Sequence, residues 1–232
     1  MEAFLEEIVR SPRLTLYQRY IDAVLSDEQK KREQFYEEVR EDQKAEFING
    51  EVIVHSPVKI EHNIVGKLLL KILDTYVQIN GLGFVGYEKM LISLTRNDYE
   101  PDICFWKKEK ASLFTPRQTR FPAPDFIAEI LSERTEKIDR SIKYDDYAAH
   151  GVGEYWIIDP VGETIEKYVL KSSGTPPTYP YYELALKVRT GEINSDVVAG
   201  FEIPVRAVFD ENENLAALRK MLSGSGFSGL KD

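Results

Sequence analysis

The feature that most limits how this chain can fold is a nearly continuous apolar segment at residues 154–159, EYWIID. A strand with one face in water alternates apolar and polar residues, whereas a strand covered on both faces is apolar almost throughout. Residues 126–131, FIAEIL, are equally apolar but carry one carboxylate, Glu129, in their middle. We therefore predict a sheet that is covered on both faces, and Glu129 requires a partner, because burying an unpaired carboxylate costs several kcal/mol.

Helical periodicity predicts the elements that would cover this sheet. Apolar residues at helical spacing predict a helix over residues 62–77, with Gly81 after its end, and a second helix over 135–150 is followed by Gly151. Upstream, residues 1–44 are dense in charged side chains. They predict an amphipathic helix, followed after Ser26 by a more solvated helix. The apolar positions of the amphipathic helix are Leu14, Tyr17, Tyr20, Ile21, Val24 and Leu25.

Further strands are predicted on either side of these helices. Asn49 and Gly50 join two short β-prone runs, and this dipeptide favours a type I′ hairpin turn. Residues 84–94 and 102–106 are expected to be strands separated by TRNDYEP, and later strands fall in TIEKYVL, YYELALKV and near VVAGFEIPV. SGSGFSGLKD would be a flexible end. The order of elements indicates a mixed α/β domain.

Composition narrows the classes of protein to consider. The chain of 232 residues is 43% hydrophobic, enough for a sizeable core, and has no apolar run long enough to cross a membrane. Its acidic beginning, MEAFLEEIVR, is unlike a signal peptide, so a cytoplasmic location is expected. The single cysteine, Cys104, lies in an apolar run and is expected to be buried. A net charge of −9 means that nucleic-acid binding would need a local basic patch.

Two carboxylates are expected to meet on one face of the sheet. Alternation along the strands puts Asp102 on the face of Cys104, and Glu129 on the face of Ile127 and Leu131. If the strands are neighbours, the paired oxygen ligands suit Mg²⁺ or Mn²⁺, whereas zinc would prefer histidine or cysteine. On the following helix, one polar stripe is formed by Asp139, Lys143, Tyr147 and His150, from which Lys143 could reach Glu129. A second, apolar face is marked by Ile138, Ile142 and Ala149.

These segments together resemble the Uma2 family, a branch of the PD-(D/E)XK, or restriction-endonuclease-like, nuclease superfamily. The matching elements are EFINGEVIVHSP with His62, then PDICF, PDFIAEILS, a D…K…Y helix with HGVGEYWIIDP, and VVAGFEIPV, over roughly residues 45–209. The resemblance implies a restriction-endonuclease-like mixed β-sheet core flanked by helices, with additional C-terminal strands. It also implies a division into an N-terminal helical extension (1–44), a nuclease domain (45–210), and a C-terminal helix and tail (211–232).

Residue roles follow from the same resemblance. Asp102 would be the Asp of the PD motif and Glu129 the second acidic residue, both binding Mg²⁺ or Mn²⁺ with help from the carbonyl of Ile130. The superfamily's usual lysine position holds Leu131, and Lys143 matches the lysine that the family supplies from the helix. The sequence LSER also replaces the usual LSPS. Supporting residues around this site would be Glu46, His62, Asp139 and Tyr147.

The implied function is a metal-dependent endonuclease that hydrolyses phosphodiester bonds in DNA, with Lys143 orienting water or stabilising the transition state. Other interpretations remain open from the residues alone. Asp102 and Glu129 could simply cap a turn or form ion pairs, and Glu46 and His62 could be a strand-surface acid and a polar residue at a helix start. The chain could be a non-catalytic binding or assembly module, or an acid/base hydrolase without metal. The amphipathic N-terminal helix offers a surface for a homodimer.

Overall fold

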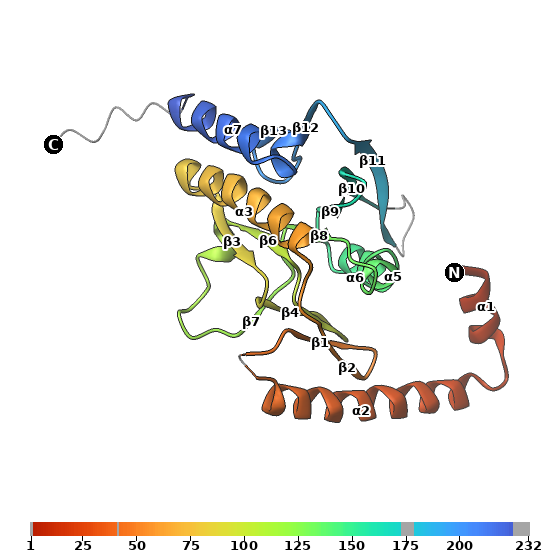
Figure 1. Cartoon of the computed structure of the whole chain (residues 1–232). Coiled ribbons are helices and arrows are strands. Elements are labelled where there is room, and N and C mark those ends of the chain that lie inside the picture. Colours follow the sequence, from red (N-terminus) through yellow and green to blue (C-terminus); the bar gives the residue numbers. More distant parts are fainter. Residues whose placement is uncertain (1, 41, 173–178, 225–232) are drawn as a thin grey trace. The chain divides into compact units, whose positions relative to one another are not determined.

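The computed structural model of this chain describes residues 2–40, 42–172 and 179–224, and it contains two compact units (Figure 1). The smaller unit comprises Met1–His55 and Thr95–Tyr99, and the larger unit comprises Ser56–Leu94 and Glu100–Asp232. Within the described parts of the chain, no helix combines the length and the apolar character needed to cross a membrane. The predicted boundaries at residues 44 and 210 stay a prediction.

The smaller unit is built from two helices and three short strands. The elements are α1 (Glu2–Arg10), α2 (Leu14–Glu38), β1 (Ala45–Ile48), β2 (Glu51–Val54) and β5 (Asp98–Tyr99). The predicted hairpin is confirmed, because β1 pairs with β2 and the turn residues Asn49 and Gly50 have φ angles of 51° and 83°. TRNDYEP was expected only to separate strands, and this was wrong: it contains β5, which pairs antiparallel with β1.

Helix α2 continues without a break through Ser26, so the predicted second helix does not exist as a separate element. The later half of α2 carries its buried side chains, which include Arg32. The Arg32 guanidinium donates hydrogen bonds of 2.6 and 2.9 Å to the fully buried carboxylate of Asp98, and the Tyr36 hydroxyl donates to the same group. Arg32 and Asp98 are 66 residues apart in the sequence. Their charged contact explains why the later, more polar half of α2 is more buried than its first half.

The apolar face predicted for the first half of α2 exists, but it is exposed. Tyr20 is 72% exposed and Ile21 is 48% exposed. Together with α1, this segment carries nine large exposed apolar side chains: Phe4, Leu5, Val9, Leu14, Leu16, Tyr17, Tyr20, Ile21 and Leu25. We call this set the N-terminal apolar face. Exposed apolar side chains concentrated on one segment mark an interaction site more often than singly scattered ones.

The larger unit is organised around a six-stranded sheet with the order β11-β10-β9-β8-β6-β3. Its strands are β3 (Gly83–Tyr87), β6 (Ile103–Lys107), β8 (Phe126–Ile130), β9 (Glu154–Asp159), β10 (Thr164–Ser172) and β11 (Pro180–Val188). The pair β8 and β9 is parallel, and the other neighbours are antiparallel. Strands β8 and β9 are buried almost throughout, which confirms the central sheet predicted from their apolar sequences.

Shorter strands complete the unit. β4 (Leu91–Ser93) pairs in parallel with β7 (Arg120–Phe121), and β12 (Glu192–Asn194) pairs with β13 (Glu202–Pro204). The single strand expected over residues 84–94 is therefore wrong, because β3 and β4 are separate. The chain leaves β3 at Glu88, whose φ angle of 46° is incompatible with a continuing strand.

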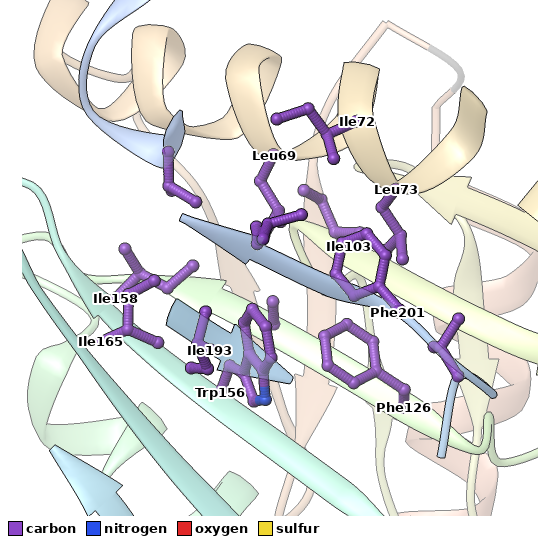
Figure 2. Close-up of a cluster of buried hydrophobic side chains, with 14 of the residues drawn as sticks. Leu69, Ile72, Leu73, Ile103, Phe126, Trp156, Ile158, Ile165, Ile193 and Phe201 are labelled. Carbon is purple, nitrogen blue, oxygen red and sulfur yellow. The ribbon is translucent and has the colours of Figure 1, made fainter. Parts of the chain in front are cut away.

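One face of the sheet is covered by α3 (Ile60–Asn80), with the 3₁₀ helix η1 (Val205–Val208) and α7 (Glu211–Gly224) beside it (Figure 1). Gly81 ends α3 with a φ angle of 60°, as predicted. Asn214 of α7 donates hydrogen bonds to the carbonyls of Leu68 and Ala207. Figure 2 shows the resulting core, which includes Leu69, Ile72, Leu73, Ile103, Phe126, Trp156, Ile158, Ile165, Ile193 and Phe201.

The opposite face is covered by α5 (Glu136–Asp139) and α6 (Ile142–Ala149), while α4 (Lys108–Ala111) follows β6. The one helix expected over 135–150 is two helices, because Ser141 leaves the helical conformation with φ −131° and ψ −84°. Gly151 follows with a φ of 76°, as predicted. Ser223 and Gly224 end α7, and the remainder of the predicted flexible end lies outside the described residues. The predicted mixed α/β class, with N-terminal helices and additional C-terminal strands, is confirmed.

Candidate functional site

The two predicted carboxylates lie next to each other at one end of the β6–β8 pair. Ile103 is opposite Ala128, and continuing this antiparallel register puts Asp102 opposite Glu129. The Glu129 Oε2 atom accepts a hydrogen bond of 3.2 Å from the Asp102 amide, and the Asp102 Oδ2 atom accepts one of 2.9 Å from the Ile130 amide. Both side chains are buried, so each carboxylate is positioned by the backbone of the other strand.

Strand alternation explains why the carboxylates are not in the main core. Ile103, Ala128 and Ile130 point toward α3, so Glu129 and Cys104 point toward the other face. Cys104 is fully buried, as predicted, and burial together with the nearby charge of Glu129 raises the pKa of its thiol well above the usual value. This cysteine is therefore a packing residue.

Lys143 reaches Glu129 from α6, as the sequence predicted. Its Nζ atom lies 2.9 Å from Glu129 Oε1 and 3.3 Å from Asp139 Oδ1, and the Tyr147 hydroxyl donates to the same Glu129 oxygen at 3.0 Å. Lys143 is only 2% exposed, and Asp139 and Tyr147 are also buried. The structure thus brings together four of the predicted site residues around Glu129: Asp102, Asp139, Lys143 and Tyr147.

The contact between Lys143 and Glu129 determines which side of this helical segment faces the sheet. The polar stripe faces the sheet, whereas the residues expected to form an apolar face are half-buried or exposed: Ile138, Ile142 and Ala149. His150 does not belong to the stripe's contacts, because its Nδ1 atom lies 3.0 Å from the Asp146 carboxylate. The polar side chains point toward the sheet because Lys143 and Tyr147 both contact Glu129 there.

Two further predicted site residues, His62 and Glu46, lie in different units of the chain. His62, in the first turn of α3, places its Nε2 atom 3.2 Å from Asp102 Oδ2, so the structure brings it to the carboxylate pair. Glu46 lies on β1 in the smaller unit, where it is buried and lies 3.0 Å from the His55 Nε2 atom. Its predicted role beside the carboxylate pair stays a prediction.

The structure also gives the contacts of Leu131 and of the LSER segment, where the sequence departs from the family pattern. Leu131, where the superfamily has lysine, is buried, and its amide donates to the carbonyl of Ile158. In the LSER segment, Glu133 pairs with Lys59 at 2.7 Å and Arg134 donates to the hydroxyl of Ser56. These contacts hold the segment after β8 to the residues that precede α3.

The donor atoms fit a hard divalent cation better than zinc. Among the described residues, no group of three or more histidine, cysteine, aspartate or glutamate side chains could hold a metal ion. Asp102 and Glu129 offer carboxylate oxygens from adjacent strands. Mg²⁺ commonly binds through one or two carboxylates, keeps several waters and accepts phosphate oxygens, whereas a closed zinc site needs more protein ligands. The two carboxylates therefore match the type of ligand that Mg²⁺ or Mn²⁺ prefers.

Sequence reasoning missed Tyr87, the last residue of β3, and Glu88, which follows it beside Asp102. The Glu88 amide donates a 2.9 Å hydrogen bond to the Asp102 carbonyl, and Tyr87 lies opposite Ile103 in the β3–β6 register. Tyr87 is 59% exposed and lines a cavity of about 270 Å³ that also contacts Asp102. No local pattern identifies these residues, because their position depends on the unexpected end of β3.

Comparisons with known proteins concern the family and the fold of the chain. The profile of the Uma2 family, described as "Putative restriction endonuclease", matches residues 32–206. A solved structure described as "a putative nuclease belonging to DUF820", from Anabaena variabilis, is similar with a TM-score of 0.57 and 18% identity, covering 76% of this chain and 96% of that chain. At this identity the likeness shows the fold. The comparison with curated protein sequences finds no match.

Proposed function

The chain belongs to the Uma2 family, and from this premise we propose that it is an endonuclease that uses Mg²⁺ or Mn²⁺ to hydrolyse phosphodiester bonds in DNA. One observation carries the proposal: buried Lys143 contacts Glu129, which in turn lies beside Asp102 on the adjacent strand. This set combines two oxygen ligands with one positive charge, the chemistry needed beside a phosphate that becomes more negative during attack.

Asp102 and Glu129 would hold the metal ion. When bound, the ion supplies a Lewis acid that neutralises phosphate charge and lowers the pKa of bound water. The Ile130 amide points to Asp102, and in an extended strand the carbonyl of the same residue points toward the same edge, so the Ile130 carbonyl would supply a third oxygen ligand. His62 positions Asp102 from the other side.

Lys143 would orient the attacking water or stabilise the charge that develops on the phosphate. Its ammonium group is held between Glu129 and Asp139, and Tyr147 fixes the Glu129 carboxylate through a hydrogen bond. Because Leu131 cannot perform this role, Lys143 supplies from α6 the charge that the superfamily usually places on the strand. The exchange preserves a cation beside Glu129 while changing the element that carries it.

The test is cleavage of plasmid and single-stranded DNA with Mg²⁺ or Mn²⁺, with and without a chelator. We expect nicked or linear products that require the metal, because in the proposed reaction the metal ion lowers the pKa of the attacking water. Absence of cleavage on every substrate, together with no metal binding by calorimetry, would instead support a binding or assembly module. Hydrolysis that survives the chelator would support acid/base chemistry without metal.

We also propose a homodimer that pairs two copies of the N-terminal apolar face. A stable interface takes roughly 800 Å² from each partner, and nine large apolar side chains on α1 and α2 can provide an area of this order. Light scattering during size exclusion should give twice the mass of one chain. Ile21→Glu should reduce it to one chain mass, while Tyr181→Glu, at an exposed tyrosine of β11, should not. A monomeric wild-type chain would contradict this proposal.

A further inference from the structure

A cavity of about 270 Å³ opens beside Asp102 on the α3 side of the sheet. This volume lies near the lower end of the range for ligand pockets, about 300–1,000 Å³, and so suits one flat ring system better than a large cofactor. The lining comes from α3 and from the ends of β3, β6 and β8. It consists of His62, Asn63, Gly66, Lys67, Leu70, Tyr87, Glu88, Asp102, Ile103 and Ile130.

Part of the lining of this cavity is apolar. Leu70, Ile103 and Ile130 contribute aliphatic side chains, and Gly66 contributes no side chain. A Cβ atom at Gly66 would lie 3.3 Å from the Ile130 Cδ1 atom, tighter than ordinary van der Waals contact, so a larger residue there would narrow the cavity. This part of the lining is therefore apolar, and we call the whole cavity the slot.

The outer rim carries groups that recognise a nucleotide. Tyr87 is 59% exposed, so its ring is accessible for stacking, and Asn63 offers a carboxamide donor and acceptor for the edge of a base. Lys67 lies 3.1 Å from the Glu211 carboxylate, with 55% and 66% of the two side chains exposed. Exposed ion pairs of this kind are weak, so the Lys67 ammonium can exchange Glu211 for a phosphate oxygen.

Backbone pairing fixes this slot relative to the carboxylates. Tyr87 is opposite Ile103, the residue after Asp102, and the Glu88 amide binds the Asp102 carbonyl. Asp102 itself lines the cavity and also accepts the Ile130 amide. Glu129 points to the opposite face of the sheet, but Asp102 directly precedes β6 and, at this strand end, adjoins both Glu129 and the slot. A phosphate bound at Asp102 would therefore lie at the end of the sheet with the slot on its α3 side.

We propose that the slot receives the base of an unpaired nucleotide next to the scissile phosphate, with Tyr87 stacking on that base. This inference rests on the proposed nuclease function and specifies its substrate class. A base in a duplex is stacked on both sides and must be extruded to enter such a pocket, at a cost of a few kcal/mol, whereas a single strand has little of this cost. The substrate is therefore DNA that is single-stranded at the cut.

The experiment separates binding from cleavage. Fluorescently labelled single-stranded and duplex oligonucleotides of one sequence are titrated with the full chain by anisotropy, with Ca²⁺ in place of Mg²⁺. We expect tighter binding of the single strand, about tenfold weaker binding for Tyr87→Ala, and near wild-type binding for Tyr87→Phe, because stacking on an aromatic ring is worth about 1–3 kcal/mol per base. Tyr181→Ala removes another exposed tyrosine, on β11, and should have no effect.

Cleavage of the same oligonucleotides with Mg²⁺ then distinguishes this inference from the function on which it rests. Cleavage by the wild-type chain combined with equal single-strand affinity for wild type and Tyr87→Ala would overturn the slot and leave the nuclease intact. Tyr87-dependent binding without any cleavage would uphold the slot and overturn the nuclease. A wild-type chain that binds no single strand, or that prefers the duplex, would also overturn the slot.

Discussion

Glu129→Gln is expected to lower the rate of metal-dependent DNA cleavage by about 1,000-fold without unfolding the protein. Glutamine has the same shape and can still accept the hydrogen bond from Tyr147, but it lacks the negative charge that a divalent cation needs. A bound metal contributes several kcal/mol to stabilising charge in the transition state, and each 1.36 kcal/mol is tenfold in rate. Initial rates on plasmid DNA, with calorimetry for Mg²⁺ binding, measure both consequences.

The matched control is Glu154→Gln. Glu154 is also a fully buried carboxylate on a central strand, but it accepts hydrogen bonds from the Ser195 hydroxyl and the amides of Asp196 and Val197. Its register partner on β8 is Phe126, at the end of that strand opposite to Ile130. We expect Glu154→Gln to change the unfolding midpoint but not Mg²⁺ binding. Equal cleavage rates for Glu129→Gln and wild type would show that Glu129 has a structural role only.

Local sequence patterns were sufficient to predict the strands and helices whose buried positions recur at regular spacing. The apolar runs of β8 and β9 identified central strands, and the spacing of Leu69, Ile72 and Leu73 identified the buried face of α3. β5 could not be found in this way, since Asp98 has low strand propensity and is stabilised by Arg32, a residue distant in sequence. The same contact explains why α2 continues beyond Ser26.

The carboxylate pair could be predicted because alternation and an antiparallel register are simple rules. Asp102 and Glu129 needed only neighbouring strands to meet, and Lys143 needed only helical spacing to reach them. The buried carboxylate of Glu129 also explains why the polar stripe on α5 and α6 faces the sheet, although polar side chains usually face solvent. The Tyr87 slot depended on where β3 ends, which no local pattern indicated.

Lys143→Met is expected to abolish cleavage and to destabilise the fold by about 3–5 kcal/mol, because it leaves buried carboxylates without their ammonium partner. Methionine keeps the length and most of the apolar stem, so loss of packing is small. The nearby acids are Glu129 and Asp139, at 2.9 and 3.3 Å from the lysine nitrogen. Urea unfolding measures the change in stability, and plasmid cleavage measures activity below the unfolding transition.

The double variant Lys143→Met with Glu129→Gln separates the two roles of the lysine. Neutralising Glu129 removes part of the unpaired charge, so the double variant should be more stable than Lys143→Met alone and yet equally inactive. Lys167→Met is the control, since Lys167 is another buried lysine, bound to the Asn194 carbonyl and to Asp196. It should destabilise the fold while cleavage persists. If Lys143→Met retained cleavage, the cation at Glu129 would serve only to neutralise a buried acid.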